Sequence, residues 1–178
     1  VVSIGLGGGS IVRQRPDGTV TVGPDSVGYA ITQKALVFGG DTLTATDIAV
    51  RLGMYRLGDP AKVAHIPEDL AKKAMAAIGA MVEDAIDAMK VSSADSDVIL
   101  VGGGSIILPE KIAGAAQVVK PDHFGCANAI GSAISKVSGT FEKLINYDEI
   151  PRDKALEKAK AEAVELAVAA GAIRDTVE

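Results

Sequence analysis

The sequence predicts a mixed α/β fold, and three observations lead to this prediction. Short β-branched or apolar runs end in two triple-glycine loops, Gly7-Gly8-Gly9-Ser10 and Gly102-Gly103-Gly104-Ser105. A helical pattern over residues 69–90 separates the two loops, and an Ala-rich helical pattern covers residues 152–170. Strands that are followed by helix, strand, loop and helix are typical of a mixed α/β core.

The N-terminal part of the chain predicts a meander of short strands. Residues 1–6, 10–15 and 19–22 are β-branched or alternating, and Pro16-Asp17-Gly18 is a turn sequence between the last two. A short apolar run at residues 35–38 predicts a further strand. The first glycine loop is therefore expected inside a hairpin rather than ahead of a helix.

The middle of the chain predicts two helices and a strand. Thr46 or Asp47 is expected to cap a short helix over residues 47–53. The clearest helix covers 69–90, where apolar side chains recur at 3.6-residue spacing. They are Leu70, Ala74, Ile78, Met81, Val82, Ala85, Ile86 and Met89. Residues 98–101 are wholly apolar and predict a central, buried strand.

The C-terminal part predicts two more helices. One runs from Cys126 to Val137, and the other is the Ala-rich segment 152–170, with Gly171 as its stop. We expect residues 1–140 to form the α/β core and residues 141–178 to form a helical extension.

Composition excludes several classes of function. The 178 residues are 48% hydrophobic and carry a net charge of −5 without a Lys/Arg cluster, which argues against nucleic-acid binding. No apolar run reaches the length that spans a membrane. The single cysteine rules out an intrachain disulfide and fits a reducing, cytoplasmic compartment. Because the chain opens with Val1 inside an apparent strand, we expect the natural protein to continue on the N-terminal side.

The glycine loops are the candidate ligand-binding elements. Consecutive glycines after a strand allow backbone N–H groups to approach an anion closely. Neither loop has the Gly-Lys-Ser/Thr ending of a Walker A loop or the spacing of a dinucleotide fold. Two interpretations stay open: a phosphate or nucleotide cleft with two walls, or ordinary tight turns.

Several motifs together resemble the hydantoinase A / 5-oxoprolinase family of the actin-like ATPase superfamily. They run in the family's order and cover most of residues 1–140. The matching segments are 3–11, 22–26, 39–41 with 44–47, and 121–131. The segment from Val101 to Pro109 resembles the superfamily's adenosine motif, and the segment from Ile4 to Ser10 resembles its second phosphate hairpin.

The resemblance implies an actin-like (RNase H-like) fold, ATP with Mg²⁺, and opening of a cyclic amide such as a hydantoin or 5-oxoproline. It implies that Gly7, Gly8, Gly9 and Ser10 hold phosphates and that Gly102, Gly103, Gly104 and Ser105 line adenine and ribose. The family's Asp-Gly-Gly-Thr phosphate hairpin is absent, so the chain resembles the C-terminal half of the ATPase core. We therefore expect the isolated chain to be inactive.

The resemblance also implies partners and rival functions. A second, hydantoinase B-type subunit or domain is expected, and a homo-oligomer is possible. Some relatives act instead as subunits of ketone carboxylases. Two functions outside catalysis also stay open: a nucleotide-binding module, and a structural domain whose glycine loops are plain turns.

Three residues are the candidate catalytic groups: Asp41, Asp47 and His123. Either aspartate could hold Mg²⁺ through water or orient an attacking water. Asp47 could equally be a helix-capping carboxylate. His123 could act as a base or ligand, or be a loop histidine bonded to backbone. The chain has one other histidine, His65, and shows no His/carboxylate cluster, so a zinc site has no support and the metal ligands stay unknown.

Cys126 follows Gly125 at the start of a predicted helix. A helix N-terminus lowers the pKa of a thiol, so a nucleophilic role is one interpretation. The favoured interpretation is a small buried side chain.

Overall fold

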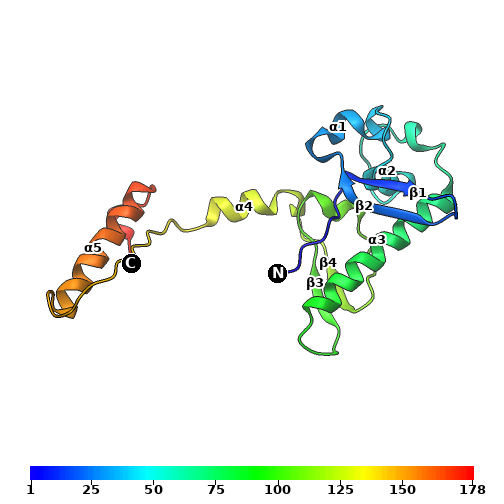
Figure 1. Cartoon of the computed structure of the whole chain (residues 1–178). Coiled ribbons are helices and arrows are strands. Elements are labelled where there is room, and N and C mark those ends of the chain that lie inside the picture. The colour runs from blue at the N-terminus through cyan, green and yellow to red at the C-terminus, as the bar shows by residue number, and fades with distance from the viewer. The chain divides into compact units, whose positions relative to one another are not determined.

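A computed structural model describes all residues, Val1–Glu178, and divides them into two compact units, Val1–Ala129 and Ile130–Glu178. The first unit contains every strand and both glycine loops (Figure 1). The class is α/β with flanking helices, as the sequence predicts. The expected single mixed sheet is replaced by two separate two-stranded sheets.

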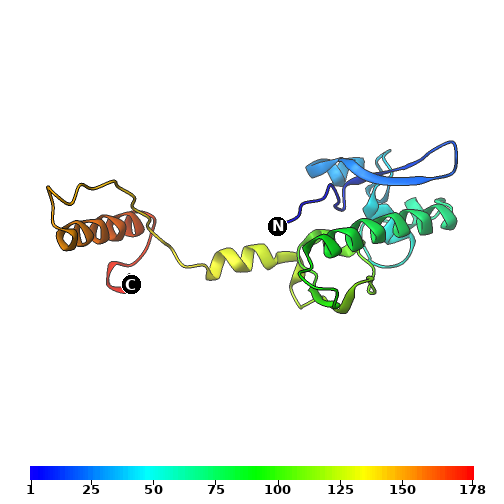
Figure 2. The same cartoon turned by 60° about the horizontal axis from the view of Figure 1, so that its bottom comes forward.

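The first sheet is the antiparallel hairpin of β1 (Ser10–Gln14) and β2 (Val20–Ser26). The predicted Asp-Gly turn connects them, because the Asp17 carboxylate accepts from the Thr19 amide at 2.9 Å and Gly18 adopts a φ of +81°. Long α3 (Glu68–Met89) runs along the hairpin and contacts β2 (Figure 1, Figure 2).

Short α2 (Ala45–Arg51) lies at the centre of the first unit and contacts β1, α3 and the turns around them. Nearly all of its residues are buried, and α1 (Ile31–Lys34) precedes it. The core of this unit combines the hairpin, α2, α3 and the apolar step after the second glycine loop. Its members include Val12, Val22, Val37, Ile48, Ala49, Ala71, Ala74, Ile78 and Ile107.

The second sheet pairs β3 (Ser96–Ile99) with β4 (Ala115–Val119) in parallel. Parallel pairing brings the carboxyl ends of both strands to one edge of the sheet. The second glycine loop follows β3 at this edge.

Three predicted strands differ in the structure. Residues 1–6 are mostly exposed and form no strand, since no neighbouring segment pairs with them. Residues 35–38 turn into a 3-10 helix, Leu36–Phe38. The run 98–101 is not a central buried strand, because Ile99 is 67% and Val101 54% exposed.

The remaining helices lie close to their predicted ranges. The structure places α4 at Ala127–Ile134 and α5 at Arg152–Ala169, with Gly171 in the left-handed conformation just beyond α5. The apolar face of α4 stays open, with Ile134 77% exposed. No helix combines the length and the apolar character that crossing a bilayer requires.

Candidate functional site

The first glycine loop is a closed turn. The Ser10 amide donates to the Gly7 carbonyl at 3.0 Å, and the Gly7 amide donates to Ser10 Oγ at 2.9 Å. Ser10 is only 2% exposed. Its hydroxyl thus shapes the loop from within, and contact of Ser10 with a phosphate stays a prediction.

The carbonyls and amides of the loop glycines have different surroundings. The Gly8 carbonyl accepts from the Thr46 amide and from Thr46 Oγ1, both at 3.0 Å, and the Gly9 carbonyl accepts from the Val27 amide at 3.0 Å. The amides of Gly8 and Gly9 donate no hydrogen bond within the protein. Two adjacent, unbonded backbone donors are the feature that suits an anion such as phosphate.

The protein also fills the space on one side of this loop. A Cβ added at Gly8 would lie 2.8 Å from Thr46 Oγ1, and one added at Gly9 would lie 2.9 Å from Ser26 Oγ. A Cβ at Gly7 would meet nothing within 4 Å. Glycine is therefore demanded by packing at two positions, and open space lies beside the third.

Asp47 is buried at the start of α2 and is saturated with hydrogen bonds. Its carboxylate accepts from the Thr44 amide (2.7 Å), Thr44 Oγ1 (2.8 Å), the Val37 amide (2.7 Å) and the Leu36 amide (3.3 Å). Thr44 is the N-cap residue and Asp47 stands three positions later, which is the capping-box arrangement. This is the environment of a structural carboxylate, and a catalytic role for Asp47 stays a prediction.

Asp41 has the opposite environment. It is exposed and accepts a single hydrogen bond within the protein, from Thr42 Oγ1 at 2.9 Å. The preceding residue, Gly40, is required by the packing of the chain itself, because a Cβ there would overlap the carbonyl of Lys34. Asp41 is thus the predicted acid that remains open to a ligand.

The second glycine loop presents bare backbone. Gly102 has a φ of +85°, and the 3-10 helix Gly103–Ile107 follows it. The Ser105 amide and Oγ both donate to the Gly102 carbonyl, at 3.1 and 2.8 Å. A Cβ at any of the three glycines would meet nothing within 4 Å. A flat group such as a purine would therefore find an uncovered surface here.

His123 and Cys126 lie in the turn ahead of α4. His123 is exposed and takes a φ of +62°, and Cys126 Sγ donates to its carbonyl at 3.3 Å. The expectation that Cys126 is buried is wrong, because the loop leaves it exposed. No group of three His, Cys, Asp or Glu side chains is placed to hold a metal, and no hydrogen bond joins His123 to either candidate aspartate.

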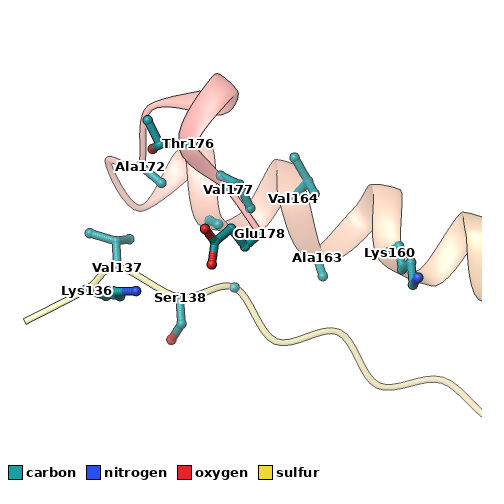
Figure 3. A pocket seen from close by; sticks show the side chains of 12 residues that line it. Lys136, Val137, Ser138, Lys160, Ala163, Val164, Ala172, Thr176, Val177 and Glu178 are labelled. Carbon is teal, nitrogen blue, oxygen red and sulfur yellow. The ribbon is translucent and has the colours of Figure 1, made fainter.

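The four cavities that we describe lie away from both glycine loops. The largest, of about 770 Å³, belongs to the C-terminal unit (Figure 3). It lies between segment 136–139, α5 and the last residues, with Lys136 and Lys160 at its margin. The candidate site is thus a pair of loops, the first half-buried and the second largely exposed at its glycines, rather than an enclosed cavity.

Two contacts of the loops were not predicted from the sequence. They are the hydrogen bond from Thr46 Oγ1 to the Gly8 carbonyl and the hydrogen bond from Lys120 Nζ to the Ser105 carbonyl. The Thr-x-x-Asp spacing of Thr44 and Asp47 does signal a capped helix, and hence a helix that begins at residue 45. No sequence signal links residue 46 to residue 8.

Residues 1–56 match the family model described as Hydantoinase/oxoprolinase. The chain is similar to this family over its first 56 residues. The match includes the first glycine loop, Asp41, Asp47 and α2. It agrees with the resemblance that the motifs give. No curated protein matches the sequence significantly.

Nearly the whole chain is also similar in fold to a solved structure. The nucleotide-free structure of acetone carboxylase, from work on the mechanism of ATP-dependent acetone carboxylation, superposes with a TM-score of 0.67 at 20% sequence identity. The match covers 98% of this chain and 31% of that one. The fold is therefore shared with part of a larger chain.

Proposed function

We propose that this chain supplies part of the ATP site of an ATP-dependent enzyme. In this proposal Gly7–Ser10 receives the β- and γ-phosphates and Gly102–Ser105 receives adenine and ribose. The observation that carries it is the pair of unbonded amides at Gly8 and Gly9, whose carbonyls are both held inside the protein. Donors fixed in this way bind an anion without reorganising.

Helix α2 supports a single ligand that contacts both loops. The first loop is bonded to α2 through Gly8 and Thr46, and the 3-10 helix Gly103–Ile107, which contains most of the second loop, packs against α2. Both loops thus lie against one helix within the unit Val1–Ala129. A nucleotide has its phosphates at one end and its base at the other, which suits two loops of different character.

Mg²⁺ would be bound chiefly through phosphate oxygens and water, as it is in many phosphoryl-transfer sites. The chain offers no ready cluster of acidic ligands, and the Asp47 carboxylate is occupied by four donors. Asp41 is the exposed carboxylate that could join the ion's shell.

The reaction we propose is the opening of a cyclic amide, such as a hydantoin or a lactam like 5-oxoproline. The γ-phosphoryl group passes to the amide oxygen and ADP leaves. Water then adds to the activated ring carbon, and the C–N bond breaks as the nitrogen takes up a proton, which leaves an acyl phosphate. A second water hydrolyses the acyl phosphate to a carboxylate and free phosphate. Phosphorylation makes the carbon electrophilic and the oxygen a good leaving group, which is the reason to spend ATP on this bond.

A carboxylase is the second candidate, and the fold match favours it. The solved chain that shares this fold is acetone carboxylase. In that case ATP would serve the joining of bicarbonate to a ketone. Residues 1–140 would again form the ATPase-like core, residues 141–178 a helical extension, and a hydantoinase B-type subunit would complete a cytoplasmic enzyme.

The test is ATP hydrolysis by the full-length protein, with its partner subunit where one exists. We expect phosphate release to rise when a hydantoin or 5-oxoproline is present, with the ring-opened product formed in equal amount. Stimulation only by a ketone with bicarbonate would select the carboxylase. Absence of binding at millimolar ATP·Mg²⁺ would remove both candidates.

A further inference from the structure

The segment after β4 holds the second glycine loop through a side chain that no sequence motif marks. Lys120 immediately follows β4, and the loop that starts at Gly102 follows β3. Because β3 and β4 are parallel, both residues stand at the carboxyl edge of the sheet, where ligands bind in open α/β folds.

Three contacts connect Lys120, Phe124 and the two ends of the loop. Lys120 Nζ donates to the Ser105 carbonyl at 3.1 Å and lies 5.0 Å from the centre of the Phe124 ring. The Phe124 carbonyl in turn accepts from the Gly102 amide at 2.7 Å. The loop is thus fixed at its first residue by backbone and at its last residue by a charged side chain. A cation over an aromatic face and a charge-assisted hydrogen bond are both stronger than their neutral counterparts.

We propose that Lys120 is a positioning residue for the nucleoside end of the ligand. It holds Gly102–Ser105 in the shape that leaves the three glycines bare, and it acts through the Ser105 carbonyl instead of touching phosphate. Glycine-rich backbone has no side chains to fix its conformation, so an external clamp reduces the ordering that binding would otherwise require. The inference rests on the proposed ATP site.

The test measures the binding of two probes, ATP·Mg²⁺ and inorganic tripolyphosphate·Mg²⁺, by calorimetry on the full-length protein. Tripolyphosphate carries the phosphates without the nucleoside. We expect Lys120→Met to weaken ATP binding about tenfold, the factor typical of one lost charge-assisted interaction, and to leave tripolyphosphate binding unchanged. Lys120→Arg, which keeps the charge and can stack on Phe124, should restore most of the ATP affinity.

Lys111→Met is the matched control, since Lys111 is exposed and makes no hydrogen bond or ion pair in the structure. Phe124→Leu removes the aromatic partner of Lys120 and so disturbs the same set of contacts. Its effect on ATP affinity should therefore not add to that of Lys120→Met. The thermal midpoint of each variant checks that the fold is retained.

Each outcome separates this inference from the proposed function. If the wild-type protein binds neither probe, the ATP site is wrong and the inference falls with it. If it binds ATP and Lys120→Met binds equally well, the ATP site stands and the clamp is refuted. Equal weakening of ATP and tripolyphosphate would show a direct phosphate contact and would also overturn positioning.

Discussion

The Gly8 carbonyl accepts hydrogen bonds from both the amide and the hydroxyl of Thr46, each at 3.0 Å. This relationship fixes a glycine-rich turn to the first turn of a buried helix. It turns the carbonyl of residue 8 into the protein and leaves the Gly8 and Gly9 amides without a partner. The donors proposed for phosphate therefore depend on a helix that lies 38 residues further along the chain.

Thr46→Val tests this anchor, because valine keeps the shape of threonine and removes the hydroxyl. We expect the free energy of unfolding to fall by about 1 kcal/mol, the usual cost of a lost buried hydrogen bond. Urea unfolding measures it. Thr42→Val is the control, since its hydroxyl bonds only the exposed Asp41. Equal stability of the two variants would refute the anchor.

Asp47→Asn tests whether this carboxylate is structural. Asparagine offers one acceptor oxygen, so some of the four donors around position 47 would stay buried without a partner. We expect a loss of about 3 kcal/mol in the free energy of unfolding. Asp41→Asn, on the exposed side, should change stability by less than about 0.5 kcal/mol. A fully stable Asp47→Asn protein without ATP turnover would instead give Asp47 the catalytic role.

Gly8→Ala and Gly7→Ala should differ although the residues are adjacent. The new methyl at position 8 would press on Thr46 Oγ1, while that at position 7 would enter open space. We expect Gly8→Ala to lower the free energy of unfolding by about 1–2 kcal/mol and Gly7→Ala to lower it by less than about 0.5 kcal/mol. Thermal unfolding followed by circular dichroism compares them. Similar melting of the two variants would contradict the packing described for this loop.

The C-terminal turn should loosen in acid. A bidentate pair joins Arg174 to Glu165 at 2.6 and 2.7 Å, and the hydrogen bond from Arg174 lowers the pKa of Glu165 below its ordinary 4.5. The pair's contribution is present above pH 4.5 and is lost as pH falls through the lowered pKa. We expect the protection factor of the Thr176 amide, which donates to the Ile173 carbonyl, to fall as the pH drops through the lowered pKa of Glu165.

Arg174→Met provides the control for this acid step. Without the guanidinium, the pKa of Glu165 loses its main cause of lowering. The protection factor of the Thr176 amide should then be low already at neutral pH and should show no further fall in acid. An unchanged acid step in Arg174→Met would assign the loosening to another group.

Local pattern was sufficient for the long helices and the hairpin. The 3.6-residue repeat predicted 69–90, and the structure has Glu68–Met89; the Asp17-Gly18 turn and its flanking strands are also confirmed. These elements rest on interactions between near neighbours, which sequence displays directly.

The structure differs from the sequence prediction where a segment's conformation or burial depends on residues far away in the chain. Residues 1–6 have strand composition but no paired neighbour, and a strand without a partner leaves its backbone groups to water. The run 98–101 is apolar, yet burial depends on what covers the sheet, and Ile99 remains 67% exposed. Similarly, the donors to Asp47 come from Leu36 and Val37, so no local motif could reveal that the carboxylate is saturated.

The central claim is that ATP uses the unbonded amides of the first loop and the bare backbone of the second. Hydrogen–deuterium exchange of the full-length protein, with and without millimolar ATP·Mg²⁺, tests it most directly. The account predicts protection of peptides that contain Gly8–Gly9 and Gly103–Gly104 with ATP, and of the Gly8–Gly9 peptide alone with tripolyphosphate. Binding of ATP that leaves both peptides unprotected would contradict it.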